Sequence, residues 1–292
     1  MLYISGFPKN LDVNNPARMN LAITNSIIGL DKPKEPFLTT SSKIASLGSC
    51  FAEEIANALK TRGHDIIYFF MSERWNSAFA VDVFLAHVID ETPLPSGFIS
   101  NIDKLEEMTQ ENREKFRAAD LFIITFGMSL CWFDANKQLV VEPGKTHTKE
   151  GLASSVKNFA MIQTSVEQNE EAILRCIHRI KRFKPNAEIV ITLSPVPMLG
   201  TVYETSVVQA NTVSKAVLRI AIENVRRKQI DGVRYWPSYE IVNWYGNHVH
   251  RSFGDDDRDE RHVRADVINL ITDQFVKNYV QPAAAEQTST PA

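Results

Sequence analysis

The segment Leu47-Gly48-Ser49-Cys50-Phe51-Ala52 joins a short strand-like run to an amphipathic helical pattern. Residues 44–46 precede it, and Phe51, Ile55 and Leu59 recur after it at helical spacing. A strand-to-helix turn here places a hydroxyl and a thiol together at a helix N-terminus. N–H groups at such a terminus lack intrahelical acceptors and lower the pKa of a thiol, so the turn could hold a nucleophile. The alternative is a serine N-cap followed by a small buried cysteine.

Strand and helix patterns alternate along the rest of the chain. Continuous apolar runs rich in β-branched residues, such as 121–126 and 189–193, are typical of strands buried on both faces. The alternation predicts an α/β fold, a three-layer α/β/α sandwich with a mostly parallel sheet. Its strands are expected at 44–46, 65–70, 121–126, 188–193 and 233–236, its helices near 80–88 and within 154–183, 211–228 and 264–279, and a hairpin at 132–141.

Three segments divide the chain. Residues 1–36 contain prolines and show weak periodicity, which predicts an N-terminal arm on the surface of the domain. Residues 37–280 are predicted to form one α/β domain, and residues 281–292, rich in Ala, Thr and Pro, are predicted to form a disordered tail. In a parallel sheet the functional site lies at the carboxyl ends of the strands, so the residues that follow each strand carry the most weight.

The composition of the chain limits the kinds of partner that we expect it to bind. The chain has 292 residues, of which 44% are hydrophobic and 23% charged, and its net charge of −3 argues against nucleic acid. The apolar runs are too short to span a membrane, and the N-terminus lacks the pattern of a signal peptide. Cys50, Cys131 and Cys176 show no paired spacing, which favours free thiols and a cytoplasmic location. The sequence leaves the oligomeric state open.

Two motifs that suggest a ligand do not meet their requirements. Gly144-Lys145-Thr146 resembles the end of a phosphate-binding loop, but Leu139 stands where that loop needs a glycine. His248 and His250, followed by acidic residues 255–257, have no third metal ligand that the spacing determines. We therefore expect neither a metal nor a cofactor.

An Asp-x-x-His motif precedes the last predicted helix. Asp259 and His262 would lie on one face of a helix start, where the carboxylate can orient the imidazole as a base. The motif is common by chance, but it complements a nucleophile at the first strand-to-helix turn.

A nucleophile early in an α/β chain and Asp-x-x-His late in it resemble the SGNH/GDSL hydrolase superfamily. Residues 48–52 match the name motif of the GSCFA family, a bacterial group related to those hydrolases, and the resemblance covers roughly residues 38–280. Other parts of the chain also resemble sequence blocks of this family. They are residues 121–127 with Trp132, His147, and residues 194–197, 214–216 and 235–241.

The resemblance implies roles for individual residues. In the register of the GDSL block, Cys50 occupies the nucleophile position and Ser49 the preceding one; Ser49 as the nucleophile is the competing assignment. The superfamily places an asparagine two residues after the glycine of its third block. In this chain Gly127 and Ser129 stand at these two positions, and the resemblance implies that both bind the oxyanion or the substrate. Asn76 is the best replacement for that oxyanion-binding amide, together with the turn at Gly48, and His147 could contact substrate.

The resemblance implies an acyl-ester hydrolase of the esterase or deacetylase type that works through an acyl-enzyme. An O-acyltransferase acting on a carbohydrate or another polyol remains open, because both reactions share the acyl-enzyme. A non-catalytic carbohydrate-binding or scaffold protein on the same fold is the third possibility, since the Gly-x-Asn block is missing. The expected partner is a small-molecule or carbohydrate ester.

Overall fold

The structure is a computed structural model whose central element is a five-stranded parallel sheet. Its strands, β1 (Lys43–Gly48), β2 (Asp65–Phe69), β3 (Leu121–Phe126), β7 (Glu188–Leu193) and β8 (Val233–Tyr235), lie in the order β2-β1-β3-β7-β8. The order reverses between β1 and β3, which in doubly wound folds marks the ligand-binding end. The structure describes residues 15–29, 32–69, 76–94, 110–111, 113–136, 139–140, 149–203, 205–254 and 260–282.

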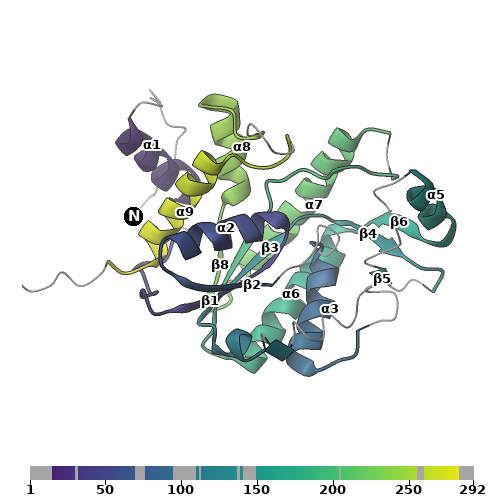
Figure 1. Cartoon of the computed structure of the whole chain (residues 1–292), viewed down its shortest axis with the longest axis horizontal. Coiled ribbons are helices and arrows are strands. Elements are labelled where there is room, and N and C mark those ends of the chain that lie inside the picture. The colour runs from purple at the N-terminus through teal and green to yellow at the C-terminus, as the bar shows by residue number, and fades with distance from the viewer. Residues whose placement is uncertain are drawn as a thin grey trace, which may run out of the picture.

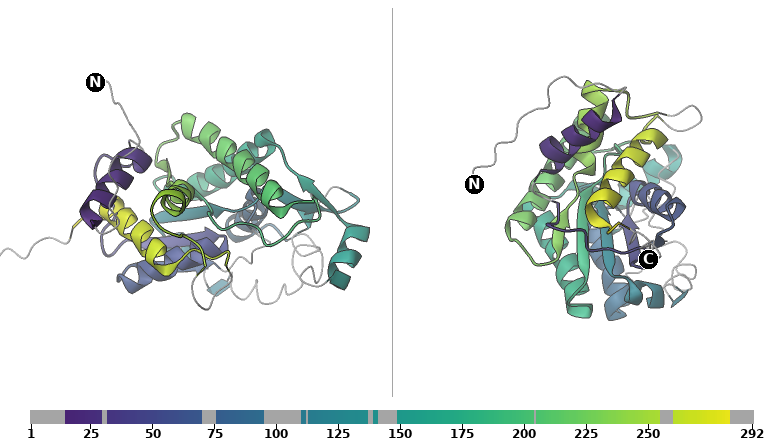
Figure 2. Two further views of the ribbon diagram at one scale, coloured as in Figure 1. Left: turned by 90° about the horizontal axis from the view of Figure 1, so that it is seen from above. Right: turned by 90° about the vertical axis from the view of Figure 1, so that its left-hand side faces the viewer.

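Helices cover both faces of the sheet (Figures 1 and 2). One face packs against α3 (Ala78–Asp90), α6 (Val166–Phe183) and α7 (Val207–Arg227). The other packs against α2 (Cys50–Thr61), α8 (Ser238–His248) and α9 (Ala265–Tyr279). The predicted three-layer α/β/α sandwich with a mostly parallel sheet is confirmed.

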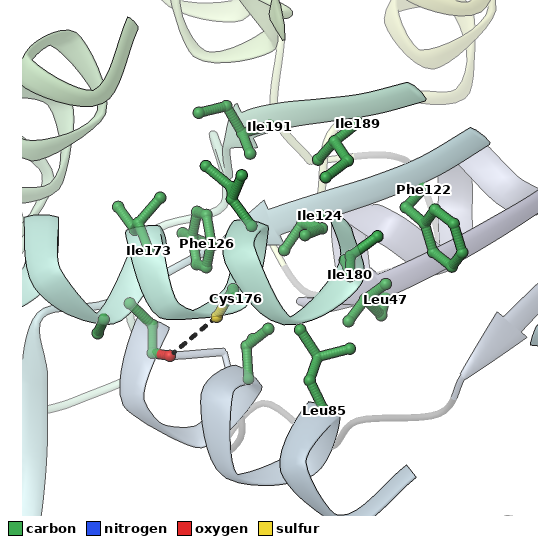
Figure 3. Close-up of a cluster of buried hydrophobic side chains, with 14 of the residues drawn as sticks. Leu47, Leu85, Phe122, Ile124, Phe126, Ile173, Cys176, Ile180, Ile189 and Ile191 are labelled. Carbon is green, nitrogen blue, oxygen red and sulfur yellow. Dashed lines mark hydrogen bonds between the residues drawn. The ribbon is translucent and has the colours of Figure 1, made fainter. Parts of the chain in front are cut away.

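Successive side chains of a strand point to opposite faces of the sheet, and this alternation explains the core between the sheet and the helices α3, α6 and α7. Side chains at every second position, such as Phe122, Ile124 and Phe126 of β3, point toward α3 and α6 and are fully buried. Figure 3 shows these residues together with Leu47, Leu85, Ile173, Ile180, Ile189 and Ile191. Cys176 of α6 belongs to the same core, and its thiol donates to the carbonyl oxygen of Ala78 at 3.8 Å.

On the other face of the sheet, the side chains change from apolar to polar along the strands. Near their amino ends this face presents Ile44, Ile123 and Val190, which pack under α2, α8 and α9. The register of β3 on β7 pairs Thr125 with Thr192, and both hydroxyls are buried with no hydrogen-bond partner among the described residues. This face of the sheet is therefore apolar at one end and polar at the end where β1 meets α2.

The helix predicted within residues 154–183 is confirmed as α6, which occupies the second part of this range. The first part belongs to α5 (Lys149–Asn158) and to β6 (Ala160–Gln163). Ser165 caps α6 in a reciprocal capping box with Gln168, and this fixes where the helix begins. The predicted hairpin is confirmed as β4 (Leu130–Phe133) and β5 (Leu139–Val140), and β6 pairs with β4 to give a second, three-stranded antiparallel sheet.

The N-terminal segment contributes to the core. Its described part forms α1 (Pro16–Ala22) and the π-helix η1 (Ile23–Ile28), which bury Ile23 and Ile28 in the cluster that includes α9. Gln274 of α9 donates to Asn20 Oδ1 at 2.6 Å. The sequence predicts an arm that lies on the surface of the domain, and the described part of this segment buries Ile23 and Ile28. None of the described helices is both long enough and apolar enough to cross a bilayer.

Candidate active site

The turn between β1 and α2 is an elbow that requires glycine. Gly48 has φ +120°, and a Cβ on it would lie 2.1 Å from the carbonyl oxygen of Thr125 on the neighbouring strand. Ser49 follows in extended conformation, and its N–H donates to the same carbonyl oxygen at 3.4 Å. The close approach of β1 to β3 therefore directs the chain abruptly into α2 at the carboxyl end of the sheet.

Ser49 and Cys50 differ in accessibility. Ser49 is 1% exposed; its Oγ is buried and has no hydrogen-bond partner among the described residues. Cys50, the first residue of α2, is partly exposed and packs against the apolar cluster beneath α8 and α9. The Ser49 side chain does not cap α2, although the Ser49 carbonyl oxygen accepts from the Ala52 N–H at 2.8 Å, and the N-terminus of this helix favours negative charge.

Asn76 lies at the carboxyl end of β3, the strand that pairs with the elbow at Gly48. Just beyond β3, Ser77 pairs with Met128, and the Gly127 N–H donates to the Asn76 carbonyl oxygen at 2.6 Å. A Cβ on Gly127 would lie 2.6 Å from Cγ and Nδ2 of Asn76, so the amide packs directly over this glycine. The N–H of Gly127, a residue that the resemblance assigns to the oxyanion or the substrate, is thus occupied by the hydrogen bond to Asn76.

Ser129 holds the loop after β3. Its N–H donates to Ser214 Oγ at 2.8 Å, and its hydroxyl contacts Ser214 and accepts from Gln163 Nε2 at 2.6 Å. Its carbonyl oxygen accepts from the Thr164 hydroxyl at 2.6 Å. Since Ser129 is also fully buried, its polar groups bind the protein rather than a ligand in this arrangement.

His262 lies in the loop before α9, half-buried, and its Nδ1 is shielded from solvent with no partner among the described residues. The neighbouring Arg261 donates from Nη1 to the Pro197 carbonyl oxygen at 3.1 Å, which brings this loop to the carboxyl end of β7. Val263 belongs to the same apolar cluster that Cys50 contacts. The His262 loop and the elbow thus share one end of the sheet.

A buried lysine, Lys215 of α7, connects these loops. Its Nζ donates to the carbonyl oxygens of Gly127, Ser194 and Val196 at 2.8, 2.8 and 2.9 Å. Residues 214–216 resemble a family block, but that resemblance assigns no role to Lys215. The signal that could have found it is its position on the stripe of α7 that is otherwise buried and apolar at Leu218, Ala221 and Ile222.

Two predicted site residues, Asp259 and His147, lie outside the residues that the structure describes. Acidic residues 255–257 also lie outside them. Within the described ranges, His, Cys, Asp and Glu side chains form no group of three or more that could hold a metal ion.

The GSCFA family model matches residues 68–275, which is more than half of the chain. The chain belongs to the GSCFA family. The matched segment of this GSCFA protein runs from β2 to α9 and includes Asn76, Gly127, Lys215 and His262, whereas the elbow at residues 48–50 precedes it. A comparison with curated proteins gives no match.

Solved structures of similar fold include esterases, lipases and acetyltransferases. A carbohydrate esterase family 2 enzyme with a carbohydrate-binding domain, from Myceliophthora fergusii, is 11% identical with a TM-score of 0.44, covering 84% of this chain and 67% of that one. A GDSL-like lipase of Bacteroides thetaiotaomicron is 7% identical with a TM-score of 0.42, covering 81% and 86%. The periplasmic domain of a lipopolysaccharide acetyltransferase of Salmonella Paratyphi A is 12% identical with a TM-score of 0.42, covering 81% and 83%.

The packing of Asn76 on Gly127 gives a testable prediction. In Gly127→Ala the added methyl group must displace the Asn76 amide. If this amide binds the oxyanion, we expect the rate of acyl transfer to fall about 10²-fold, as for the loss of one oxyanion-hole donor. Steady-state kinetics of Gly127→Ala, Asn76→Ala and the double variant measure the effect.

The double variant distinguishes an effect through Asn76 from a general disturbance. If Gly127→Ala acts by moving Asn76, the double variant loses no more activity than Asn76→Ala alone. Wild-type kinetics for Gly127→Ala would contradict the assignment of Asn76 to the oxyanion.

Proposed function

We propose that this GSCFA protein is an acyl-ester hydrolase that works through an acyl-enzyme on Cys50. The observation that carries the proposal is the elbow, where a glycine that tolerates no side chain places a partly exposed thiol at the start of α2. Helix N-termini favour negative charge, which suits both a thiolate and a developing oxyanion.

The reaction uses the groups gathered at this end of the sheet. His262 accepts the proton of the Cys50 thiol, and the thiolate sulfur attacks the carbonyl carbon of the ester. First-turn N–H groups of α2 and the Asn76 amide bind the oxyanion. The bond to the alcohol oxygen then breaks as His262 returns the proton to that oxygen, which leaves a thioester on Cys50 that water hydrolyses. Asp259 orients His262, as the Asp-x-x-His spacing suggests.

Cys50 is preferred to Ser49 because of the accessibility of the two side chains. A buried Oγ cannot reach a substrate carbonyl without movement of the elbow, whereas the cysteine is partly exposed. Cysteine is also the stronger intrinsic nucleophile, since it forms thiolate at neutral pH far more readily than serine forms alkoxide.

The proposal is tested with chromogenic short-chain acyl esters. We expect hydrolysis by the wild-type protein, and a rapid acid quench should trap an acyl group on the peptide that contains Cys50. Because His262 supplies general base catalysis, His262→Gln should lower kcat about 10²- to 10⁴-fold. His248→Gln, on the exposed end of α8, is the matched control and should leave kcat unchanged.

Other outcomes would select the alternatives. Ester formation on an added polyol in preference to hydrolysis would make the protein an O-acyltransferase with the same acyl-enzyme. Neither turnover nor acylation of Cys50 or Ser49, with acyl esters or acyl thioesters, would show that the fold serves binding rather than catalysis.

A further inference from the structure

Lys215 is a buried cation with no ion-pair partner in the described part of the chain. It is 2% exposed and lies on the buried stripe of α7, where its neighbours are apolar. Burial of an unpaired charge is costly, and lysine is almost never fully buried without a partner. The site must therefore compensate this charge in another way.

Three backbone carbonyls provide that compensation. The ammonium group has three protons, and the carbonyl oxygens of Gly127, Ser194 and Val196 accept all three at 2.8–2.9 Å. A neutral amine carries two protons and could not satisfy the three acceptors, so the geometry fits the charged form. The same bonds tie the loop after β3 to the loop after β7.

These contacts place the cation between the components of the site. Gly127 holds Asn76, and the carbonyl next to Val196, that of Pro197, accepts from Arg261 beside His262. The elbow that carries Cys50 reaches the same strand end, because Gly48 pairs with Thr125, two residues before the Gly127 carbonyl that Lys215 binds. Burial lowers the pKa of Lys215 to about 7, and a Cys50 thiolate raises it. Coulomb attraction is mutual, so the Lys215 ammonium favours the thiolate as much as the thiolate favours the ammonium.

We propose that Lys215 is a positioning residue of the acyl-transfer site, whose ammonium holds Gly127, Ser194 and Val196 in place and favours the thiolate of Cys50. The inference rests on the proposed function, because the thiolate is the attacking species. It adds a source of positive charge from α7, on the opposite face of the sheet from the helix that carries Cys50.

Other charged groups near Lys215 are compensated or belong to the site. Arg219, one turn further along α7, is paired with Glu240 and Glu223. From neighbouring elements, the loop before α9 contributes Arg261 and His262. His262 is retained in every variant that is compared, because it is the base of the proposed reaction.

The thiol itself reports the effect in the absence of substrate. Cys131 and Cys176 are buried, and burial raises the pKa of Cys131 to about 12 and that of Cys176 well above its ordinary value. Alkylation of the folded protein by iodoacetamide, followed by peptide mass spectrometry, therefore measures Cys50. The thiolate sulfur displaces iodide, so the rate follows the thiolate fraction at each pH.

We expect Lys215→Met, which keeps most of the side-chain volume, to shift the midpoint of the alkylation profile upward by about one pH unit or more. The rate at pH 7 should fall about tenfold. Lys215→Arg keeps the charge and should give a smaller shift. Ser214→Ala is the matched control, because it releases Ser129 from α7 without removing a charge, and its profile should stay at the wild-type midpoint.

An equal shift in Ser214→Ala and Lys215→Met, or no shift in Lys215→Met, would overturn the proposal. Should Lys215→Met fail to fold, the wild-type profile decides: a midpoint at or above about 8.5, the ordinary value for cysteine, would overturn it, and a lower midpoint that Lys215→Arg preserves would support it. The alkylation experiment uses no ester, so it tests the role of Lys215 separately from the esterase activity. The midpoint can shift in a protein that hydrolyses no ester, and a protein that hydrolyses esters can show no shift.

Discussion

Cys50→Ala is expected to lower esterase activity about 10³-fold or more, whereas Ser49→Ala should change it less than tenfold. The reason is that loss of a nucleophile removes the covalent route entirely, while Ser49 Oγ is buried away from any substrate. Initial rates with a short-chain acyl ester, at a substrate concentration well above KM, measure the two variants side by side.

The free energy of unfolding is a second measurement that distinguishes Cys50 from Ser49 as the nucleophile. Ser49 Oγ has no hydrogen-bond partner among the described residues, and an unsatisfied buried polar group lowers stability. Ser49→Ala should therefore raise the free energy of unfolding by about 1 kcal/mol in urea titration. Cys50→Ser tests the chemistry, since it places a hydroxyl instead of a thiol at this partly exposed position and should keep only residual activity.

The reverse pattern would change the mechanism. Activity that survives Cys50→Ala and disappears in Ser49→Ala would assign the acyl-enzyme to serine, with Cys50 as a packing residue of the α2 face. The elbow geometry would still hold, because Gly48 determines the turn for both residues.

The parallel sheet was predictable from the sequence because its strands are buried on both faces. In runs such as Leu121–Phe126 and Glu188–Leu193, every residue contributes to the pattern that predicts a strand. The structure has both strands with the predicted bounds. Residues 160–163 alternate between exposed and half-buried positions at the edge of a small sheet. Their weak pattern merged with the helices on either side, although Ser165 and Gln168 spell a capping box that marks where α6 begins.

The candidate site was predictable to the extent that it depends on local sequence. The turn at residues 48–50 combines a strand end, a glycine and a helix start, and all three are local signals. The roles of Gly127 and Ser129 depend on contacts with Asn76 and Ser214, which are distant in the chain, so the sequence could not show that their polar groups are occupied. The cradle of Lys215 likewise comes from carbonyl oxygens, which carry no sequence signal.

Gly48→Ala should lower the free energy of unfolding by about 3 kcal/mol or more, because two penalties coincide at one residue. The φ of +120° is unfavourable for a side chain, and the new Cβ would meet the Thr125 carbonyl oxygen at 2.1 Å. That oxygen belongs to the backbone of β3 and cannot rotate away, so relief requires β1 and β3 to separate where Gly48 pairs with Thr125. Urea unfolding followed by circular dichroism measures the change.

Variants of two other glycines distinguish backbone strain from steric conflict as the cause of the effect at Gly48. Gly63 has φ +84°, and a Cβ added to it would meet no atom within 4 Å, so Gly63→Ala should show backbone strain alone, about 1–2 kcal/mol. Gly200 has neither a positive φ nor a close atom, and Gly200→Ala should be nearly neutral. If Gly48→Ala costs no more than Gly63→Ala, the approach of β1 to β3 does not determine the elbow. A larger cost, with loss of Cys50 alkylation at neutral pH, would tie the shape of the turn directly to the reactivity of the thiol.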